Sequence, residues 1–436
     1  MPVLLIGMLD ERAEVLHLMR RLMEERGHRV ILADISIGTG GIASTLKPEF
    51  ASKEILAEGG IGQKEIHGLL LRERNRLVSA MASGLARKVS SLTDKGELDG
   101  IVAVCGLTGA LISLEAMKVA PFGLPKLLVS SACALPAYAE RLAEYLVTSD
   151  ITVMHTVIDT VGANRLVRSI AFNAANAICG MIERRPPPED EERPLIALTE
   201  FGFCERAAIH LREMLKDRYE VVSFHAQGWG DRAACELVRQ GLFHAFIDLV
   251  PAGFSEHLLG GNRMAGPDRL EATKDLPIPY ILTPCGFDMI SCGPYERRDR
   301  HDPLWTSRRL SERKLFVQDR MRVQARTSQE EMEEIAQKVA ERLNGLKYKE
   351  LVKFVIPERG FSSLSVKGGP LYDPLSDRAF IETLGKCLSL EIEIVRVKAQ
   401  ANSRAFAKAI VRALQRALRK KVESASETRI SGRPSS

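Results

Sequence analysis

Residues suited to binding an anion stand in the turn Gly106-Leu107-Thr108-Gly109, directly after the apolar run Ile101–Val104. Glycines let the backbone approach a ligand closely, a helix beginning here would offer free N–H groups, and Thr108 adds a hydroxyl. No lysine follows as in a P-loop, and the glycine spacing differs from the dinucleotide-binding fingerprint. The turn therefore predicts either an anion site or a plain tight turn between strand and helix, and the local sequence slightly favours the plain turn.

Two earlier turns have a similar setting. In Leu9-Asp10-Glu11-Arg12, Asp10 could cap a helix and face the edge of a sheet, and Arg12 could reach a phosphate. A helix cap and a solvated arginine explain the same residues, and the cap is the simpler interpretation. The turn Gly38-Thr39-Gly40-Gly41 lies in a flexible loop, which could close over a ligand or have no particular role.

A fourth turn, Phe224–Asp231, repeats the strand–glycine–helix layout in the second half of the chain. His225 at the strand end could act as a base or as a hydrogen-bond donor, although a structural histidine is the commoner outcome. Gly228 and Gly230 would shape the turn. Because the layout recurs in both halves, we expect the halves to share a cleft.

The segment 296–326 is basic, with ten Arg or Lys residues against five Asp or Glu residues. Its excess of +5 equals the formal net charge of the whole chain. Tyr295, Trp305 and Phe316 are interspersed, so a phosphorylated ligand, an acidic partner or RNA could bind here. An ordinary solvated surface with interleaved acids fits the pattern better than RNA binding does, and a small anion stays open.

Composition excludes several classes of protein. The 436 residues are 45% hydrophobic and 27% charged, which rules out a mainly disordered chain, a collagen and a disulfide scaffold. No apolar run approaches the roughly 18 residues of a membrane-spanning helix. A net charge of +5 is too small for a protein whose whole surface binds nucleic acid. We therefore expect neither a membrane nor nucleic acid as a partner.

The first residues and the cysteines indicate a cytoplasmic protein. The run Val3–Ile6 has no basic segment before it and is cut short by Asp10 and Glu11, unlike a signal peptide. The eight cysteines contain no Cys-x-x-Cys pair and are scattered through apolar segments, so we predict buried reduced thiols in place of zinc ligands or disulfides. The sequence has no paired-carboxylate motif, nucleophile elbow or metal-ligand cluster, so no metal-binding residues are predicted.

The elements that must position these turns alternate as strand and helix along the chain. Short apolar runs between helical patterns predict parallel strands covered on both faces. The expected fold is α/β, with two doubly wound, mostly parallel-sheet, Rossmann-like domains facing a cleft. We also expect a loop over 36–62, one long helix over 64–91, and a helix over 161–182 whose small residues suit close packing or a subunit interface.

Three prolines and four acids break this alternation at 186–192 and cannot form a core. The expected organisation is therefore an N-terminal nucleotide-binding-like α/β domain at 1–183, a linker at 184–194, a C-terminal α/β domain at 195–420 and a disordered tail at 421–436. In such sheets function is expected at the carboxyl ends of the strands.

Several segments, in this order, resemble one family: the ATP-binding N-terminal region of the tomato mosaic virus resistance protein and its bacterial and fungal relatives. The resemblance covers about residues 1–418. Each segment alone is unspecific, but their order and spacing together are fairly specific. The matching residues are Val3–Gly7 with Leu9 and Asp10, Gly106–Gly109, Gly123–Ser130, Ser149–Met154, Phe201-Gly202, Phe224–Ala226, Ala265–Ala272, Asp288-Met289, Arg326-Thr327, Ile356-Pro357 with Gly360 and Ser362, and Gly369-Pro370 with Asp373-Pro374.

The resemblance implies two α/β subdomains, self-association and binding of ATP with Mg2+ in the N-terminal half, and no settled catalytic activity. The family's usual Leu-Asp-Thr-Lys loop is changed here, because Glu11 and Arg12 replace the Thr and the Lys. Arg12 keeps the positive charge, and Glu11 adds a negative charge near any phosphate. Resemblance and turn chemistry together point to these nucleotide-binding residues: Asp10, Arg12, Gly106, Thr108, Gly109 and Ser130.

Three functions follow, in order of preference. The first is a nucleotide-binding protein that takes ATP with Mg2+. The second is an enzyme acting on a small anionic metabolite at the interdomain cleft, with His225, Asp288 and Arg326 as candidate groups. The third is a non-catalytic, homo-oligomeric interaction protein. Whether the protein is an enzyme stays open at this point.

Overall fold

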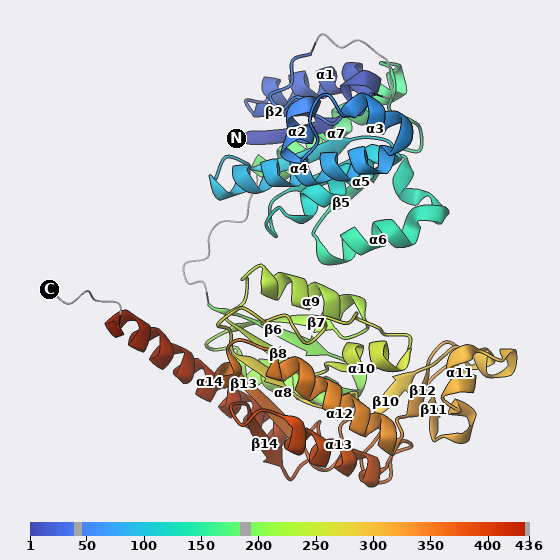
Figure 1. Cartoon of the computed structure of the whole chain (residues 1–436), viewed down its shortest axis with the longest axis vertical. Coiled ribbons are helices and arrows are strands. Elements are labelled where there is room, and N and C mark those ends of the chain that lie inside the picture. Colours follow the sequence, from blue (N-terminus) through green and yellow to red (C-terminus); the bar gives the residue numbers. More distant parts are fainter. Residues whose placement is uncertain (39–45, 184–192, 432–436) are drawn as a thin grey trace. The chain divides into compact units, whose positions relative to one another are not determined.

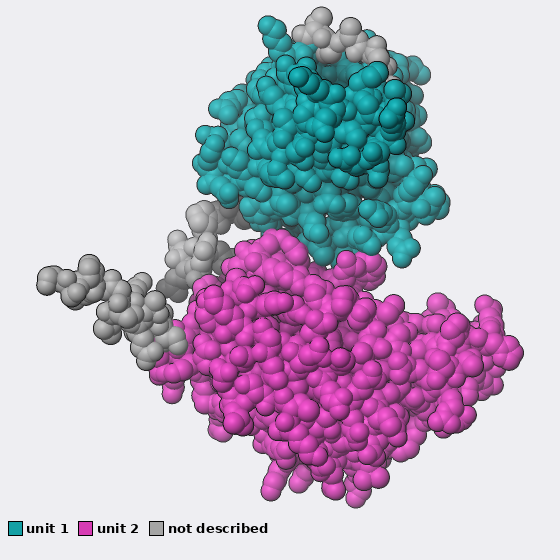
Figure 2. Space-filling model, in the orientation of Figure 1, with its two compact units in different colours: residues 1–189 teal, residues 190–436 magenta. Residues whose placement is uncertain are grey.

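The computed structural model describes residues 1–38, 46–183 and 193–431 (Figure 1). The chain divides into two compact units, Met1–Glu189 (unit 1) and Asp190–Ser436 (unit 2) (Figure 2). Each unit is built on a parallel sheet with helices on both faces, which confirms the predicted α/β class with two Rossmann-like domains. Within the described ranges, no helix has the length and apolar character that crossing a membrane requires.

The sheet of unit 1 has five parallel strands in the order β2-β1-β3-β4-β5. Four of them have an apolar middle with almost no exposed surface, as expected for strands covered on both faces. The strands are β1 (Pro2–Gly7), β2 (Arg29–Asp34), β3 (Gly100–Val104), β4 (Lys126–Ser130) and β5 (Thr152–His155).

Alternate residues of these strands face two separate hydrophobic cores. Leu4 and Ile6 of β1 pack under α2, α4 and α5, whereas Val3 and Leu5 pack under α1 and α7. This period of two is what a strand buried on both faces requires. The helices of unit 1 are α1 (Leu9–Glu25), α2 (Ser52–Glu58), α3 (Ile66–Arg72), α4 (Arg74–Asp94), α5 (Leu107–Lys118), α6 (Ala139–Thr148) and α7 (Arg165–Glu183).

Two predicted elements of unit 1 differ in the structure. The single helix expected over 64–91 is broken at Glu73, whose φ of −142° and ψ of 51° are not helical, so α3 and α4 are separate. No glycine or proline marks this break. The loop expected over 36–62 contains α2, which buries Ile55 and Leu56 in the core.

Small residues of α7 are used within unit 1. Ala171, Ala174 and Ala175 are buried against the sheet, together with Ile178. Close packing therefore accounts for this part of the predicted small-residue face.

The contacts of Lys126 connect two of the segments that carry the family resemblance, 123–130 and 149–154. Its side chain has no exposed surface, although lysine is rarely buried unless paired. The Nζ atom donates to the carbonyls of Pro121 and Leu124 at 2.8 and 3.0 Å and forms an ion pair with Asp150. This contact joins the starts of β4 and β5, at the end of the sheet opposite to the carboxyl ends of the strands.

The main sheet of unit 2 has six parallel strands in the order β14-β13-β9-β8-β6-β7. A second, three-stranded antiparallel sheet, in the order β10-β12-β11, was not predicted. The main strands are β6 (Leu195–Glu200), β7 (Glu220–His225), β8 (Ala245–Asp248), β9 (Tyr280–Leu282), β13 (Val352–Pro357) and β14 (Glu393–Val397); the small sheet consists of β10 (Met289–Ser291), β11 (Leu315–Val317) and β12 (Val323–Arg326).

Helices cover both faces of the main sheet of unit 2 (Figure 1). Residues of α8 and α14 form one core, and residues of α9, α10, α12 and α13 form the other. The last helix extends to Ser431, beyond the expected start of the tail at 421. The helices are α8 (Glu205–Leu215), α9 (Trp229–Arg239), α10 (Ala252–Leu259), α11 (Pro303–Ser307), α12 (Gln329–Asn344), α13 (Pro374–Cys387) and α14 (Arg404–Ser431).

A buried ion-pair network crosses the interior of unit 2. Arg269 has no exposed side-chain surface and binds both oxygens of Asp248 at 2.7 Å. Its Nε donates to Asp231 at 2.8 Å, and the Tyr280 hydroxyl donates to Asp248 at 2.8 Å. A buried charge is tolerated only when it is paired and hydrogen-bonded. Here all three nitrogens of the guanidinium donate to a carboxylate.

All eight cysteines are free thiols. Six are buried, as predicted, whereas Cys133 is half-buried and Cys387 is exposed. Burial raises the pKa of Cys105 to about 12, so the thiol beside the Gly106 turn stays protonated near neutral pH.

Candidate functional site

The carboxyl ends of β1 and β3 lie side by side in unit 1. Gly7 at the end of β1 pairs with Val104 at the end of β3, and the strand order reverses between these two strands. In doubly wound sheets the crevice at this reversal is the usual ligand site. The two turns that follow these strands are those singled out from the sequence, 9–12 and 106–109.

Arg12 and Gly106 are brought into contact by these turns. A Cβ atom on Gly106 would lie 3.0 Å from Nη2 of Arg12, so glycine leaves the space that the guanidinium fills. Arg12 is 3% exposed and interrupts helix α1, because its φ of −128° and ψ of 24° are not helical. The side chain of the first turn therefore lies against the backbone of the second.

The loop after β5 also contacts Arg12. Nη2 donates to Asp159 at 2.7 Å and Nε donates to Thr160 at 3.2 Å, while Nη1 forms an ion pair with Glu11. Burial alone would lower the pKa of the Arg12 guanidinium, but the bonds to Asp159 and Glu11 outweigh burial and raise that pKa. Sequence reasoning missed Asp159 and Thr160, since no local pattern connects them with the first turn.

Gly106 is the N-cap of α5 and offers no side-chain cap. The first N–H groups of a helix have no intrahelical acceptor and carry partial positive charge. The backbone at Leu107, Thr108 and Gly109 therefore presents donors beside Arg12. Thr108 is half-buried. Gly109 is required for packing, because a Cβ there would lie 2.6 Å from Cβ of Cys105.

The remaining unit 1 candidates, Asp10 and Ser130, make local turn contacts. The N–H of Asp10 donates to Oγ of Ser36 at 3.1 Å, and Oδ1 of Asp34 accepts from the N–H of Leu9 at 3.1 Å. Side chains at the end of β2 and just after it therefore hold the start of α1. Sequence reasoning missed these contacts, although Asp34 ends an apolar run. Ser130 is buried and its Oγ accepts from the N–H of Ala132 at 3.1 Å.

In unit 2, Asp288 and Arg326 lie together. Nη1 of Arg326 donates to the carbonyl of Asp288 at 3.2 Å, and Nη2 binds Asp377 at 2.6 Å. The Asp288 carboxylate accepts from the Ser362 hydroxyl at 2.5 Å. Ser362 and Asp377 complete a cluster that sequence reasoning found only in part.

None of the contacts described for His225 involves that cluster. It is exposed at the end of the edge strand β7, and its ring centroid is 6.1 Å from that of Phe201. The glycines that follow shape the turn: Gly228 has a φ of +81°, and a Cβ on Gly230 would lie 2.1 Å from the carbonyl oxygen of His225. Asp231 in the same turn belongs to the Arg269 network.

The arginines of the basic segment 296–326 mostly form ion pairs. Arg308 and Arg313 both bind Glu331, which also belongs to the capping box at the start of α12, and most of the other pairs are local. The further pairs are Arg297 with Asp302, Arg298 with Asp299, Arg309 with Glu312, Arg322 with Asp319, and Arg326 with Asp377. Apart from the buried pair of Arg326 with Asp377, the segment fits the surface with interleaved acids that the sequence favours. The glycine turn 38–41 lies outside the described residues except for Gly38.

Comparison with known proteins covers both units. The N-terminal domain of the uncharacterised protein family UPF0261 matches residues 1–187, and its C-terminal domain matches residues 193–418. A UPF0261 protein of Clostridium tetani is 30% identical over 407 residues, which cover 93% of this chain and 96% of that protein. The ToMV resistance protein Tm-1 of Solanum lycopersicum is 27% identical over 350 residues, covering 79% of this chain and 43% of that protein.

The similarity to a solved structure is too weak to support a conclusion about function. The match to a Streptomyces glycosyltransferase complexed with thymidine diphosphate covers 65% of this chain and 81% of that chain. The two are 14% identical, and the TM-score is 0.17.

Proposed function

This chain belongs to the uncharacterised protein family UPF0261, and from that premise we propose that unit 1 binds a nucleotide, ATP with Mg2+, at the carboxyl ends of β1 and β3. The resemblance described above implies ATP, and the family name assigns no activity. The proposal therefore rests on the turn geometry of this chain.

The observation that carries the proposal is the approach of Arg12 to Gly106. It puts a buried guanidinium within 3.0 Å of the Cβ position of the residue that caps α5. Guanidinium groups and the N–H groups of a helix start both favour phosphate, and here they meet at the strand reversal where doubly wound sheets bind ligands. The first turn of α5 and Thr108 would hold phosphate oxygens.

Binding at this place involves an exchange of anions. The Asp159 carboxylate, whose side chain is 62% exposed, now holds the position beside Arg12 that a phosphate oxygen would take. A phosphate must displace this carboxylate to reach Nη2. Carboxylate oxygens of Asp10 and Glu11 are of the type that Mg2+ prefers, and a bound Mg2+ would offset their negative charge next to the phosphates.

Calorimetry with ATP and Mg2+ tests the proposal. We expect the protein to bind at millimolar ATP or below, and Arg12→Ala to weaken binding by about tenfold or more, because a charge-assisted hydrogen bond is lost. Arg20→Ala, which removes another arginine of α1 that pairs with Glu24 and Glu49, is the matched control and should bind like the wild type. Absence of binding at millimolar ATP, or equal affinity in Arg12→Ala, would overturn the proposal.

A further inference from the structure

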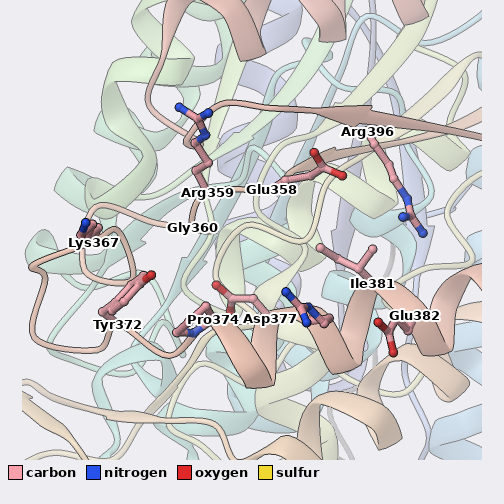
Figure 3. Close-up of a pocket in the computed structure, with 11 residues that line it drawn as sticks. Glu358, Arg359, Gly360, Lys367, Tyr372, Pro374, Asp377, Ile381, Glu382 and Arg396 are labelled. Carbon is pink, nitrogen blue, oxygen red and sulfur yellow. The ribbon is translucent and has the colours of Figure 1, made fainter.

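A cavity of about 650 Å³ lies wholly within unit 2 (Figure 3). Its wall comes from the loop after β13, from the first turns of α13 and from β14. Figure 3 shows Asp377 of α13 below Glu358 and Arg359, with Lys367 and Arg396 on opposite sides. The cavity has the volume of a small-molecule site and stands at the carboxyl end of a parallel strand.

The loop that forms one wall is held in place by buried hydrogen bonds. The Ser365 hydroxyl accepts from the N–H groups of Phe361 and Ser362 at 3.0 and 3.1 Å. The Ser362 hydroxyl donates to Asp288 in the core. Gly360 has a φ of +114°, and a Cβ there would lie 3.0 Å from the carbonyl oxygen of Ser365, so the loop requires glycine at its bend. Contacts within the chain therefore hold this wall in place.

The floor of the cavity carries a buried ion pair. Asp377 is 6% exposed and binds Arg326, which is 3% exposed, at 2.6 Å. Burial raises the pKa of Asp377 to about 6; Arg326 lowers it and the Asp288 carboxylate raises it further. In the described part of unit 2, Oδ1 of Asp288 and Nε of Arg326 have no hydrogen-bond partner. A carboxylate at the floor accepts hydrogen bonds and repels a second anion.

Four cations surround the mouth, and none of them forms an ion pair with a described residue. They contrast with the arginines of the basic segment, most of which are paired. Two carboxylates, Glu358 and Glu382, also line the mouth, so the cations outnumber the unpaired acids there. The four are Arg359, Lys367, Arg378 and Arg396.

We propose that this cavity binds a small hydroxylated organic anion, a phosphate ester or a polycarboxylate. Its anionic groups contact the four cations at the mouth, and its neutral hydroxyl end donates a hydrogen bond to Asp377 at the floor. Tyr372 and Ile381 supply the apolar surface between the two ends. The site is independent of the nucleotide site in unit 1.

Calorimetry on the full chain with citrate and with glucose 6-phosphate tests this inference, and glucose is the uncharged control ligand. The test variant is Arg378→Glu with Arg396→Glu. Arg300→Glu, an exposed cation outside the cavity, is the control protein for the change of charge and for folding. The same titrations in Arg12→Ala separate this site from unit 1, because phosphate bound near Arg12 would be lost there.

We expect at least one of the two anions to bind at about millimolar concentration or below, with no binding of glucose. The paired charge reversal should weaken binding at least tenfold, whereas Arg300→Glu and Arg12→Ala should stay within twofold. Binding of citrate alone would assign carboxylates, and binding of the sugar phosphate alone would assign phosphate esters. Failure of both anions to bind at 10 mM, or unchanged affinity in the charge-reversed variant, would overturn the inference.

Discussion

Arg269, which lies in one of the segments that carry the family resemblance, has a structural role in the core of unit 2. Its guanidinium lies with Asp231 and Asp248 among side chains that have no exposed surface. The sequence singles out the segment Ala265–Ala272 but contains no local signal for these partners, which are 38 and 21 residues away. Pairing between residues so far apart in the chain depends on the folded sheet. The sequence could therefore single out Arg269 but could not predict its ion pairs.

Replacing Arg269 by Met should destabilise unit 2 by about 3–5 kcal/mol, because two buried carboxylates would lose their counter-charge. The control is Arg239→Met, which removes a partly exposed arginine that pairs with Asp268 and Glu236. That change should cost no more than about 1 kcal/mol. Urea unfolding measures both, and equal midpoints for the two variants would contradict a structural role for the network.

Asp377 should make stability depend on pH. Its folded pKa of about 6 lies above the usual 3.8, so the folded state binds the proton more tightly than the unfolded state does. The stability from this group is present below pH 3.8 and is lost as pH rises to about 6. Arg326, Asp288, Asp373 and Arg378 are the charged neighbours.

Relative to Asp377→Asn, the wild type should therefore lose about 2 kcal/mol of stability as pH rises from 4 to 7. Denaturant unfolding of both proteins at several pH values gives this difference, in which the other titrating groups largely cancel. A constant difference across that range would show that the carboxylate titrates normally.

At the scale of elements, the sequence predicted the parallel strands well because most of them are compact apolar runs between helical patterns. It missed the strands β10, β11 and β12, which have only three or four residues each and include Gln324 and Arg326. It also missed the break at Glu73, where no glycine or proline stands. Elements this short are set by tertiary pairing, which local periodicity does not record.

The start of α5 offers a test of element packing. Gly106→Ala introduces a Cβ 3.0 Å from Arg12, so the guanidinium must shift. We expect ATP affinity to fall by about tenfold, because the arginine would lose its place beside the helix start.

Gly180→Ala in α7 is the control, because its Cβ would meet nothing within 4 Å. Alanine has the higher helix propensity, so this change should raise stability by about 0.5–1 kcal/mol and leave binding unaltered. Calorimetry and thermal unfolding check both changes. If Gly106→Ala bound ATP with wild-type affinity, Gly106 would not be needed for ligand binding.

At the scale of the whole molecule, each described hydrophobic core belongs to one unit. Two cores contain only residues before Glu183, and the other two contain only residues after Pro194. The two family domains match the same division, at 1–187 and 193–418. Each unit therefore has the hydrophobic core of its own that an independently folding domain requires.

Residues 193–436 produced alone should consequently fold and unfold in one cooperative transition. Circular dichroism during heating measures this, and Arg269→Met in the same fragment should lower its midpoint. A fragment without a cooperative transition would show that unit 2 needs unit 1 to fold.

The most direct measurement for nucleotide binding is a crystal structure of the full chain with ATP and Mg2+. We expect phosphate oxygens beside the N–H groups at the start of α5 and beside Arg12, with Asp159 moved away from the guanidinium. ATP bound elsewhere, or a crystal grown in millimolar ATP with Asp159 still paired to Arg12 and no nucleotide there, would contradict nucleotide binding at the carboxyl ends of β1 and β3.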